Sequence, residues 1–122
     1  SSAASDVYKR QIIYDDRIME MCFGTYEGIE NSFEIPDCPI NVLFKDPVNY
    51  IPVENGESFE QLFARTGEFL EQAVRPQLED GKDVLIVGHG AMNSSIVCQI
   101  KNEPLENFWK AGIKNCKLMK LI

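Results

Sequence analysis

His89 is the only histidine in this chain of 122 residues, and its neighbours suggest the chemistry it could support. It lies between Gly88 and Gly90, directly after the apolar run of residues 84–87. Such a run is typical of a buried strand, and the glycines allow a tight turn before a helix. Ligands bind at the carboxyl ends of strands in open α/β sheets, and free N–H groups at a helix start favour anions. The sequence therefore predicts a phosphate site that contains one titratable ring.

Glu20 is a candidate proton donor. It precedes residues 22–28, a turn-forming segment whose aromatic and apolar side chains could keep a carboxyl group protonated. A carboxylic acid of that kind can protonate a leaving alkoxide. The simpler interpretation is a solvated glutamate in a loop.

Glu57, Ser58 and Arg65 are candidates for binding a substrate phosphate. Glu57 and Ser58 stand at the start of a predicted helix, where capping and helix-dipole effects also explain them. Arg65 follows seven residues after Ser58 and lies near the same side of that helix. An arginine in this position is commonly just solvated, so only its register makes it a candidate.

Other interpretations of the His89 turn compete with a phosphate site. A dinucleotide fold needs glycine or alanine at the sixth position from Gly88, where this chain has Asn93, and no acid for a ribose is evident. An α/β-hydrolase needs a Gly-x-Ser-x-Gly motif, which the sequence lacks. This motif alone also allows a purely structural histidine, whose ring nitrogens form hydrogen bonds within the turn.

The elements that must position these residues alternate between helices and extended runs. The clearest helix begins after Ser58, which can form a capping box with Gln61. Apolar residues recur along it at helical spacing, Pro76 kinks it and Gly81 ends it. A second helix follows the histidine turn to about Lys101, and residues 105–110 add a helical turn.

Strands are predicted at residues 12–15, 84–87 and 116–122. The expected fold is α/β, a three-layer α/β/α sandwich with a mostly parallel sheet in which residues 84–87 are an interior strand. Residues 29–56 are rich in proline and asparagine, which predicts a long irregular substrate-loop segment that can include one short helix.

Composition excludes several functional classes. A net charge of −7 lacks the basic surface that binding to nucleic acid or to an anionic membrane needs. No run of about eighteen apolar residues occurs. Cys22, Cys38, Cys98 and Cys116 lack Cys-x-x-Cys spacing, so we expect reduced thiols, a cytoplasmic location and no metal. The length fits one domain.

The start of the chain is unusual. There is no initiator methionine, and residues 5–11 are similar to translated adapter sequence from environmental DNA. We therefore set residues 1–11 aside as non-native and expect residues 12–122 to be the carboxyl-terminal part of a longer domain.

Three segments together resemble the histidine phosphatase superfamily, which has the phosphoglycerate mutase-like fold. They are Met-Glu-Met-Cys-Phe-Gly-Thr-Tyr-Glu-Gly at residues 19–28, Gly-Glu-Ser at 56–58 with Arg65, and Val-Gly-His-Gly at 87–90. The resemblance covers about residues 12–122, in the order of the family. Each segment alone is weakly specific for the family, but the three segments together are specific.

This resemblance implies hydrolysis of a small phosphorylated metabolite through a phosphohistidine. In the family, the nucleophile belongs to an Arg-His-Gly motif, and a second histidine, which matches His89, helps to hold the transferring oxygens. The general acid of the family matches Glu20, and backbone N–H groups near Gly90 and Ala91 would add anion donors. No metal or cofactor is implied. Glu20 and His89 should therefore face one pocket, with Glu57 at its rim.

The chain departs from the family pattern at its start, because it contains no Arg-His-Gly. Where a family arginine should follow Ser1 and Ser2, the chain has Asp6, and Arg10 is out of register. We therefore expect the amino-terminal strand and the nucleophile to be missing, and the chain alone to be inactive, whereas the intact parent is a phosphatase. Two alternatives stay open: a phosphoglycerate mutase, and a noncatalytic module that binds a phosphorylated ligand or a protein.

Overall fold

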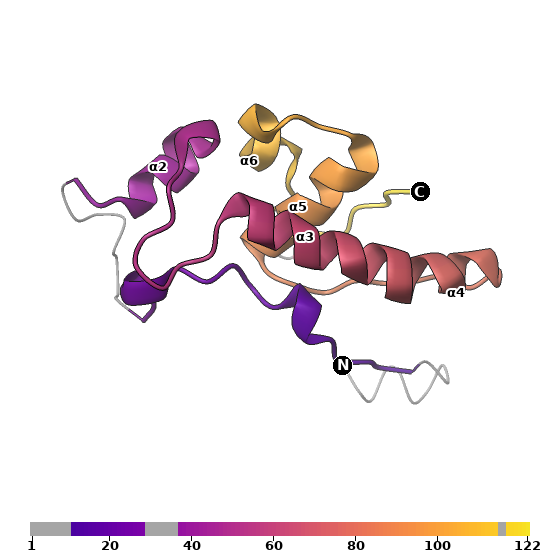
Figure 1. Cartoon of the computed structure of the whole chain (residues 1–122). Helices are drawn as coiled ribbons and strands as arrows, with labels where there is room; N and C mark the ends of the chain where they lie inside the picture. The colour runs from indigo at the N-terminus through magenta and orange to yellow at the C-terminus, as the bar shows by residue number, and fades with distance from the viewer. Residues whose placement is uncertain (1–10, 29–36, 115–116) are drawn as a thin grey trace.

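The computed structural model describes residues 11–28, 37–114 and 117–122, and helices are the regular elements of these parts (Figure 1). Two helices form the centre, α3 (Phe59–Phe69) and α5 (Gly90–Lys101), which pack against each other. α3 continues through the π-helical turn η5 (Leu70–Val74) into α4 (Arg75–Glu79). The shorter elements are η1 (Asp16–Ile18), η2 (Gly24–Tyr26), α2 (Ile40–Lys45), η4 (Pro47–Asn49), η6 (Leu105–Asn107) and α6 (Phe108–Ala111).

A capping box fixes the start of α3, as predicted. The Ser58 hydroxyl accepts a hydrogen bond from the Gln61 N–H at 3.1 Å, and the Gln61 side chain accepts one from the Ser58 N–H at 2.9 Å. Pro76 lies just after η5. Because proline has no N–H and crowds the turn before it, the helix passes this point through a widened turn. Gly81 follows the end of α4 with a left-handed φ of 77°.

The predicted bounds of α5 are also confirmed. The helix begins at Gly90 with His89 as its N-cap residue and ends at Lys101, followed by the C-cap residue Asn102, which has a left-handed φ of 56°. The chain between α5 and its end adds the helical turn expected at residues 105–110, as η6 and α6. In the segment expected to be irregular, residues 37–56 contain α2 and η4, and residues 29–36 lie outside the described parts.

A buried polar contact sets the register between α3 and α5. The hydroxyl oxygens of Thr66 and Ser95, both fully buried, are 3.1 Å apart, and the Gln99 amide donates to the Thr66 oxygen at 2.8 Å. The helices approach closely here, because a Cβ atom at Gly67 would lie 2.7 Å from the Gln99 side-chain oxygen. Apolar side chains pack around this contact on both sides.

The predicted sandwich with a mostly parallel sheet is wrong for the described residues, which form no strand. Their one β-type pairing is an isolated antiparallel bridge between Phe23 and Gly56. Residues 84–87 form no strand with any other described segment: Ile86 packs on the core, whereas Leu85 and Val87 are 68% and 79% exposed. Residues 12–15 and 117–122 are likewise not strands. The physical reason is that an apolar extended segment becomes a strand only when a neighbouring segment accepts and donates its backbone hydrogen bonds.

Candidate functional site

The Glu20 carboxylate lies at the amino terminus of α5. Its Oε1 accepts hydrogen bonds from the N–H groups of Met92 at 2.9 Å and Met21 at 2.8 Å, and its Oε2 accepts one from Ala91 at 3.2 Å. Unpaired N–H groups and the helix dipole at this end complement a negative charge. The surroundings of Glu20 therefore differ from the apolar ones expected from the sequence, because backbone donors meet both carboxylate oxygens.

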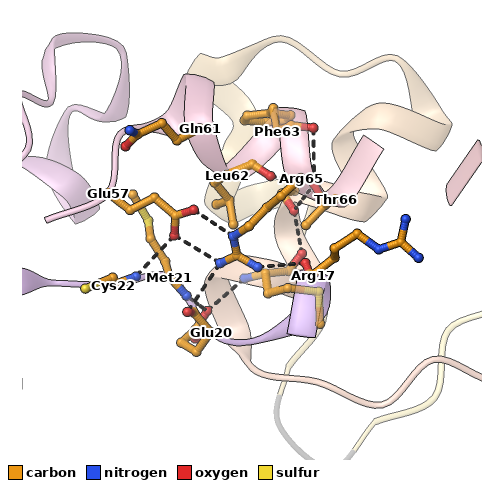
Figure 2. A network of polar contacts seen from close by, with 12 residues as sticks. Arg17, Glu20, Met21, Cys22, Glu57, Gln61, Leu62, Phe63, Arg65 and Thr66 are labelled. Carbon is orange, nitrogen blue, oxygen red and sulfur yellow. Dashed lines mark hydrogen bonds and ion pairs between the residues drawn. The ribbon is translucent and has the colours of Figure 1, made fainter. Parts of the chain in front are cut away.

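Arg65 projects from α3 onto the segment that carries Glu20 (Figure 2). Its Nε and Nη2 bind the two carboxylate oxygens of Glu57 at 2.6 and 3.0 Å. Its Nη1 donates to the carbonyl of Arg17 at 2.7 Å, and Nη2 also donates to the carbonyl of Glu20 at 3.3 Å. The Arg65 and Glu57 side chains are 22% and 13% exposed, so solvent only partly screens the pair.

Glu57 ties the start of α3 to the chain that follows Glu20. Its Oε1 accepts a hydrogen bond from the Cys22 N–H at 3.2 Å, and its own N–H donates to the Cys22 carbonyl at 2.9 Å. Gly24 fits beside this contact because it has no side chain: a Cβ atom there would collide with the Glu54 carbonyl oxygen, and its φ is 56°. Glu57 is thus held against the chain two residues after Glu20, and its place at the rim of a phosphate pocket stays a prediction.

Arg17 is a polar anchor that the sequence analysis did not single out. Its guanidinium binds both carboxylate oxygens of Asp15 at 3.0 and 2.8 Å and the Gln72 side chain at 3.0 Å. The same group lies 5.8 Å from the centre of the Phe69 ring. Hydrogen bonds from Arg17 hold the pKa of Asp15 below its ordinary value. The closeness of Asp15 and Arg17 was visible in the sequence, but their packing on α3 and η5 carried no sequence signal.

His89 stands beside this network and does not line the same hollow. An open surface hollow is lined by Glu20, Glu57 and Arg65, among others, and His89 is not one of its lining residues. His89 is exposed as the N-cap residue of α5, and the Glu20 carboxylate reaches Ala91, two residues further on. This hollow contains Glu20 and Glu57 but not His89, so it is not the pocket that Glu20 and His89 were predicted to share.

The other candidate residues have local contacts. The Ser58 hydroxyl caps α3, and Gly90 is the first residue of α5. The turn before α5 is close-packed, because a Cβ atom at Gly88 would collide with the Met92 side chain. A direct contact of Gly90, Ser58 or Arg65 with phosphate stays a prediction. Among the described residues no group of His, Cys, Asp or Glu side chains is arranged to hold a metal ion, and no helix has the length and apolar character to cross a membrane.

The sequence is similar to proteins of known family over nearly its whole length. The family model described as the histidine phosphatase superfamily (branch 1) matches residues 2–122. A relative from Hydrogenobacter thermophilus, named "Putative phosphoserine phosphatase 2", is 30% identical over 120 residues, which are 96% of this chain and 57% of that protein. The chain therefore spans a little over half the length of this relative. No solved structure matches the chain.

Proposed function

This chain belongs to the histidine phosphatase superfamily, and we propose that it supplies the general acid Glu20 and the supporting histidine His89 to a phosphomonoesterase. The family and the named relative support an activity of the phosphatase or mutase type. The observation that carries the finer proposal is the hydrogen bond between Glu20 and the Ala91 N–H. It brings the candidate acid next to the turn that bears the only histidine of the chain.

In the proposed reaction, a histidine nitrogen outside this chain attacks the phosphorus while the bond to the leaving oxygen breaks. Glu20 donates its proton to that oxygen, and the product alcohol departs. A water then attacks the phosphohistidine, Glu20 takes a proton from this water, and the phosphorus–nitrogen bond breaks. His89 and the N–H groups at the start of α5 would hold the phosphoryl oxygens, which are the charged part of the transition state.

The geometry makes one demand on this cycle. The N–H groups of Ala91 and Met92 are now used by the Glu20 carboxylate. A phosphoryl oxygen can therefore reach them only when the Glu20 side chain gives way, which also frees its carboxyl group to approach the leaving oxygen. We propose a small phosphomonoester as substrate and, by similarity to the named relative, phosphoserine as the first compound to test.

A comparison of three proteins tests this proposal. The first is the 122-residue chain, the second a longer parent that includes an Arg-His-Gly segment before residue 12, and the third that parent with His89→Ala. We expect the unsubstituted parent to release phosphate from phosphoserine and the 122-residue chain to release none. In the His89→Ala parent the rate of release should fall by about 10²-fold or more. Strong turnover by the 122-residue chain, or an unimpaired His89→Ala parent, would show that the chemistry is misassigned. A mutase would instead move phosphate between hydroxyl groups of phosphoglycerate.

A further inference from the structure

Resting on the proposed role of Glu20 as general acid, we propose that Arg65 is a positioning residue. Its guanidinium fixes the backbone of residues 17–20 so that the Glu20 carboxylate meets the amino terminus of α5. The ion pair with Glu57 orients the guanidinium for this task. This role differs from the direct contact with substrate phosphate that the sequence suggested.

The donors of Arg65 are used within the protein. An arginine has five N–H groups, and four hydrogen bonds link those of Arg65 to Glu57 and to the carbonyls of Arg17 and Glu20. The two carbonyls belong to residues three apart, so one rigid planar group holds both ends of the short turn. Since Glu20 itself is one of the two, its Cα atom is held beside the α5 terminus, both while the carboxylate binds there and when, in the proposed cycle, the carboxyl group turns to the leaving oxygen.

Glu57 compensates the charge of Arg65. Both of its carboxylate oxygens face the guanidinium, at 2.6 and 3.0 Å, and both side chains are partly buried. An arginine paired in this bidentate way presents less positive charge to an incoming phosphate than a free one. Glu57 also holds the Cys22 N–H, so the same carboxylate fixes the chain on the other side of Glu20.

One turn of α3 sets the distance between the two parts of the site. Arg65 holds the segment that carries Glu20, whereas its neighbour Thr66 contacts Ser95 of α5 at 3.1 Å through a fully buried hydroxyl pair. The same turn of α3 therefore holds both the Glu20 backbone and α5. Loss of the Arg65 contacts should release the segment that carries Glu20 and leave the packing of α3 on α5 unchanged.

Nuclear magnetic resonance on the 122-residue chain tests this directly. The amide resonances of Met21, Ala91 and Met92 report the hydrogen bonds to the Glu20 carboxylate, and Glu20→Ala defines their positions when those bonds are lost. We expect Arg65→Met to move the Ala91 and Met92 resonances at least halfway to the Glu20→Ala positions. Amides of the α3–α5 contact should stay unchanged.

Control variants separate this role from a general effect of losing an arginine. Arg75→Met removes an exposed arginine that pairs with Glu71 one helical turn away, and it should leave the Ala91 and Met92 resonances unmoved. Glu57→Gln keeps the packing but weakens the pair, and should shift them in the same direction as Arg65→Met. If Arg65→Met does not fold, the shift of the Ala91 and Met92 resonances in Glu57→Gln tests the proposal instead. Unmoved resonances in the folded Arg65 variant, or in Glu57→Gln, would overturn the proposal.

Kinetics on the longer parent add a readout that a merely structural role would not give. The ratio kcat/KM reports the steps up to formation of the phosphoenzyme, where proton donation matters most for a poor leaving group. We expect Arg65→Met to lower kcat/KM for phosphoserine by about 10- to 100-fold, and to change it little for an aryl phosphate with a good leaving group. Equal losses on both substrates would contradict positioning of the acid. A parent without phosphatase activity would refute the proposed function instead, and the amide resonances would still decide the role of Arg65.

Discussion

At the scale of single residues, two carboxylates near the start of the described chain have different kinds of partners. Glu20 accepts three hydrogen bonds from neutral backbone N–H groups, two of them at a helix start. Asp15 binds the charged guanidinium of Arg17, which in turn contacts Gln72. In the proposed cycle a phosphoryl oxygen takes the place of the Glu20 carboxylate, because a helix amino terminus favours either anion. The Asp15 contact instead anchors the turn on α3 and η5.

The Asp15 contact predicts a pH dependence of stability. Because hydrogen bonds from Arg17 lower the pKa of Asp15 in the folded state, its contribution is fully present above the unfolded value of about 4 and is lost as the pH falls through the folded value. Asp15→Asn should therefore lower the free energy of unfolding at pH 7 more than at pH 3. Urea denaturation of both proteins at the two pH values measures this. An equal difference at both values would contradict the pairing.

At the scale of elements, the contact between α3 and α5 determines the site geometry. Thr66, Ser95 and Gln99 form a buried polar group between helices whose other contacts are largely apolar. Such a group favours one register, because a slipped pairing would leave buried polar atoms without partners. The apolar contacts alone would tolerate small shifts more easily.

Thr66→Val should destabilise the chain by about 1–3 kcal/mol, since the isosteric side chain removes the acceptor of the Gln99 amide and the partner of the Ser95 hydroxyl. Thr66→Ser keeps the hydroxyl and is the matched control, with a smaller loss from the missing methyl group. Chemical denaturation of the three proteins gives the comparison. A Thr66→Val protein that proved as stable as Thr66→Ser would show that the polar contact does not set the register.

Local sequence signals predicted the helices well, and non-local pairing was not predictable. The capping box of Ser58 and the glycine turn before α5 act within a few residues, so the sequence alone indicated both helix starts. The apolar run at residues 84–87 also had a clear pattern, but a strand depends on a partner elsewhere. In the site, the family resemblance predicted that Glu20 and His89 face one pocket, but it did not predict the hydrogen bonds from α5 to the Glu20 carboxylate. The carbonyl contacts of Arg65 had no signal, because every residue carries a carbonyl group.

At the scale of the whole molecule, apolar side chains remain exposed along its extended segments. Ile86 packs on the core while Leu85 and Val87 face outward, and Leu118 and Ile122 near the chain end are 84% and 75% exposed. Exposed apolar surface of this kind binds hydrophobic dyes and promotes association. The chain should therefore show these properties although its helices are well packed.

Val87→Thr should lower the binding of a hydrophobic fluorescent dye and the tendency to associate, and it should leave the helical circular dichroism signal unchanged. Ile51→Thr is the matched control, because both side chains are 79% exposed but Ile51 belongs to another segment and lines a surface hollow with Pro39 and Pro52. Dye titration and sedimentation of both variants measure the effect. An equal reduction of dye binding and association in the two variants would show that residues 84–87 contribute no more to these properties than other exposed apolar side chains.

We propose that Glu20 transfers the proton in both steps of a phosphohistidine cycle. Rapid-mixing kinetics of Glu20→Gln in the longer parent test this role. With an aryl phosphate that has a good leaving group, the first step needs no acid, whereas hydrolysis of the phosphoenzyme needs a base. We expect a burst of aryl alcohol close to one equivalent per enzyme, followed by turnover slowed by about 10²-fold or more. Steady turnover at the rate of the unsubstituted parent, with no burst, would contradict it.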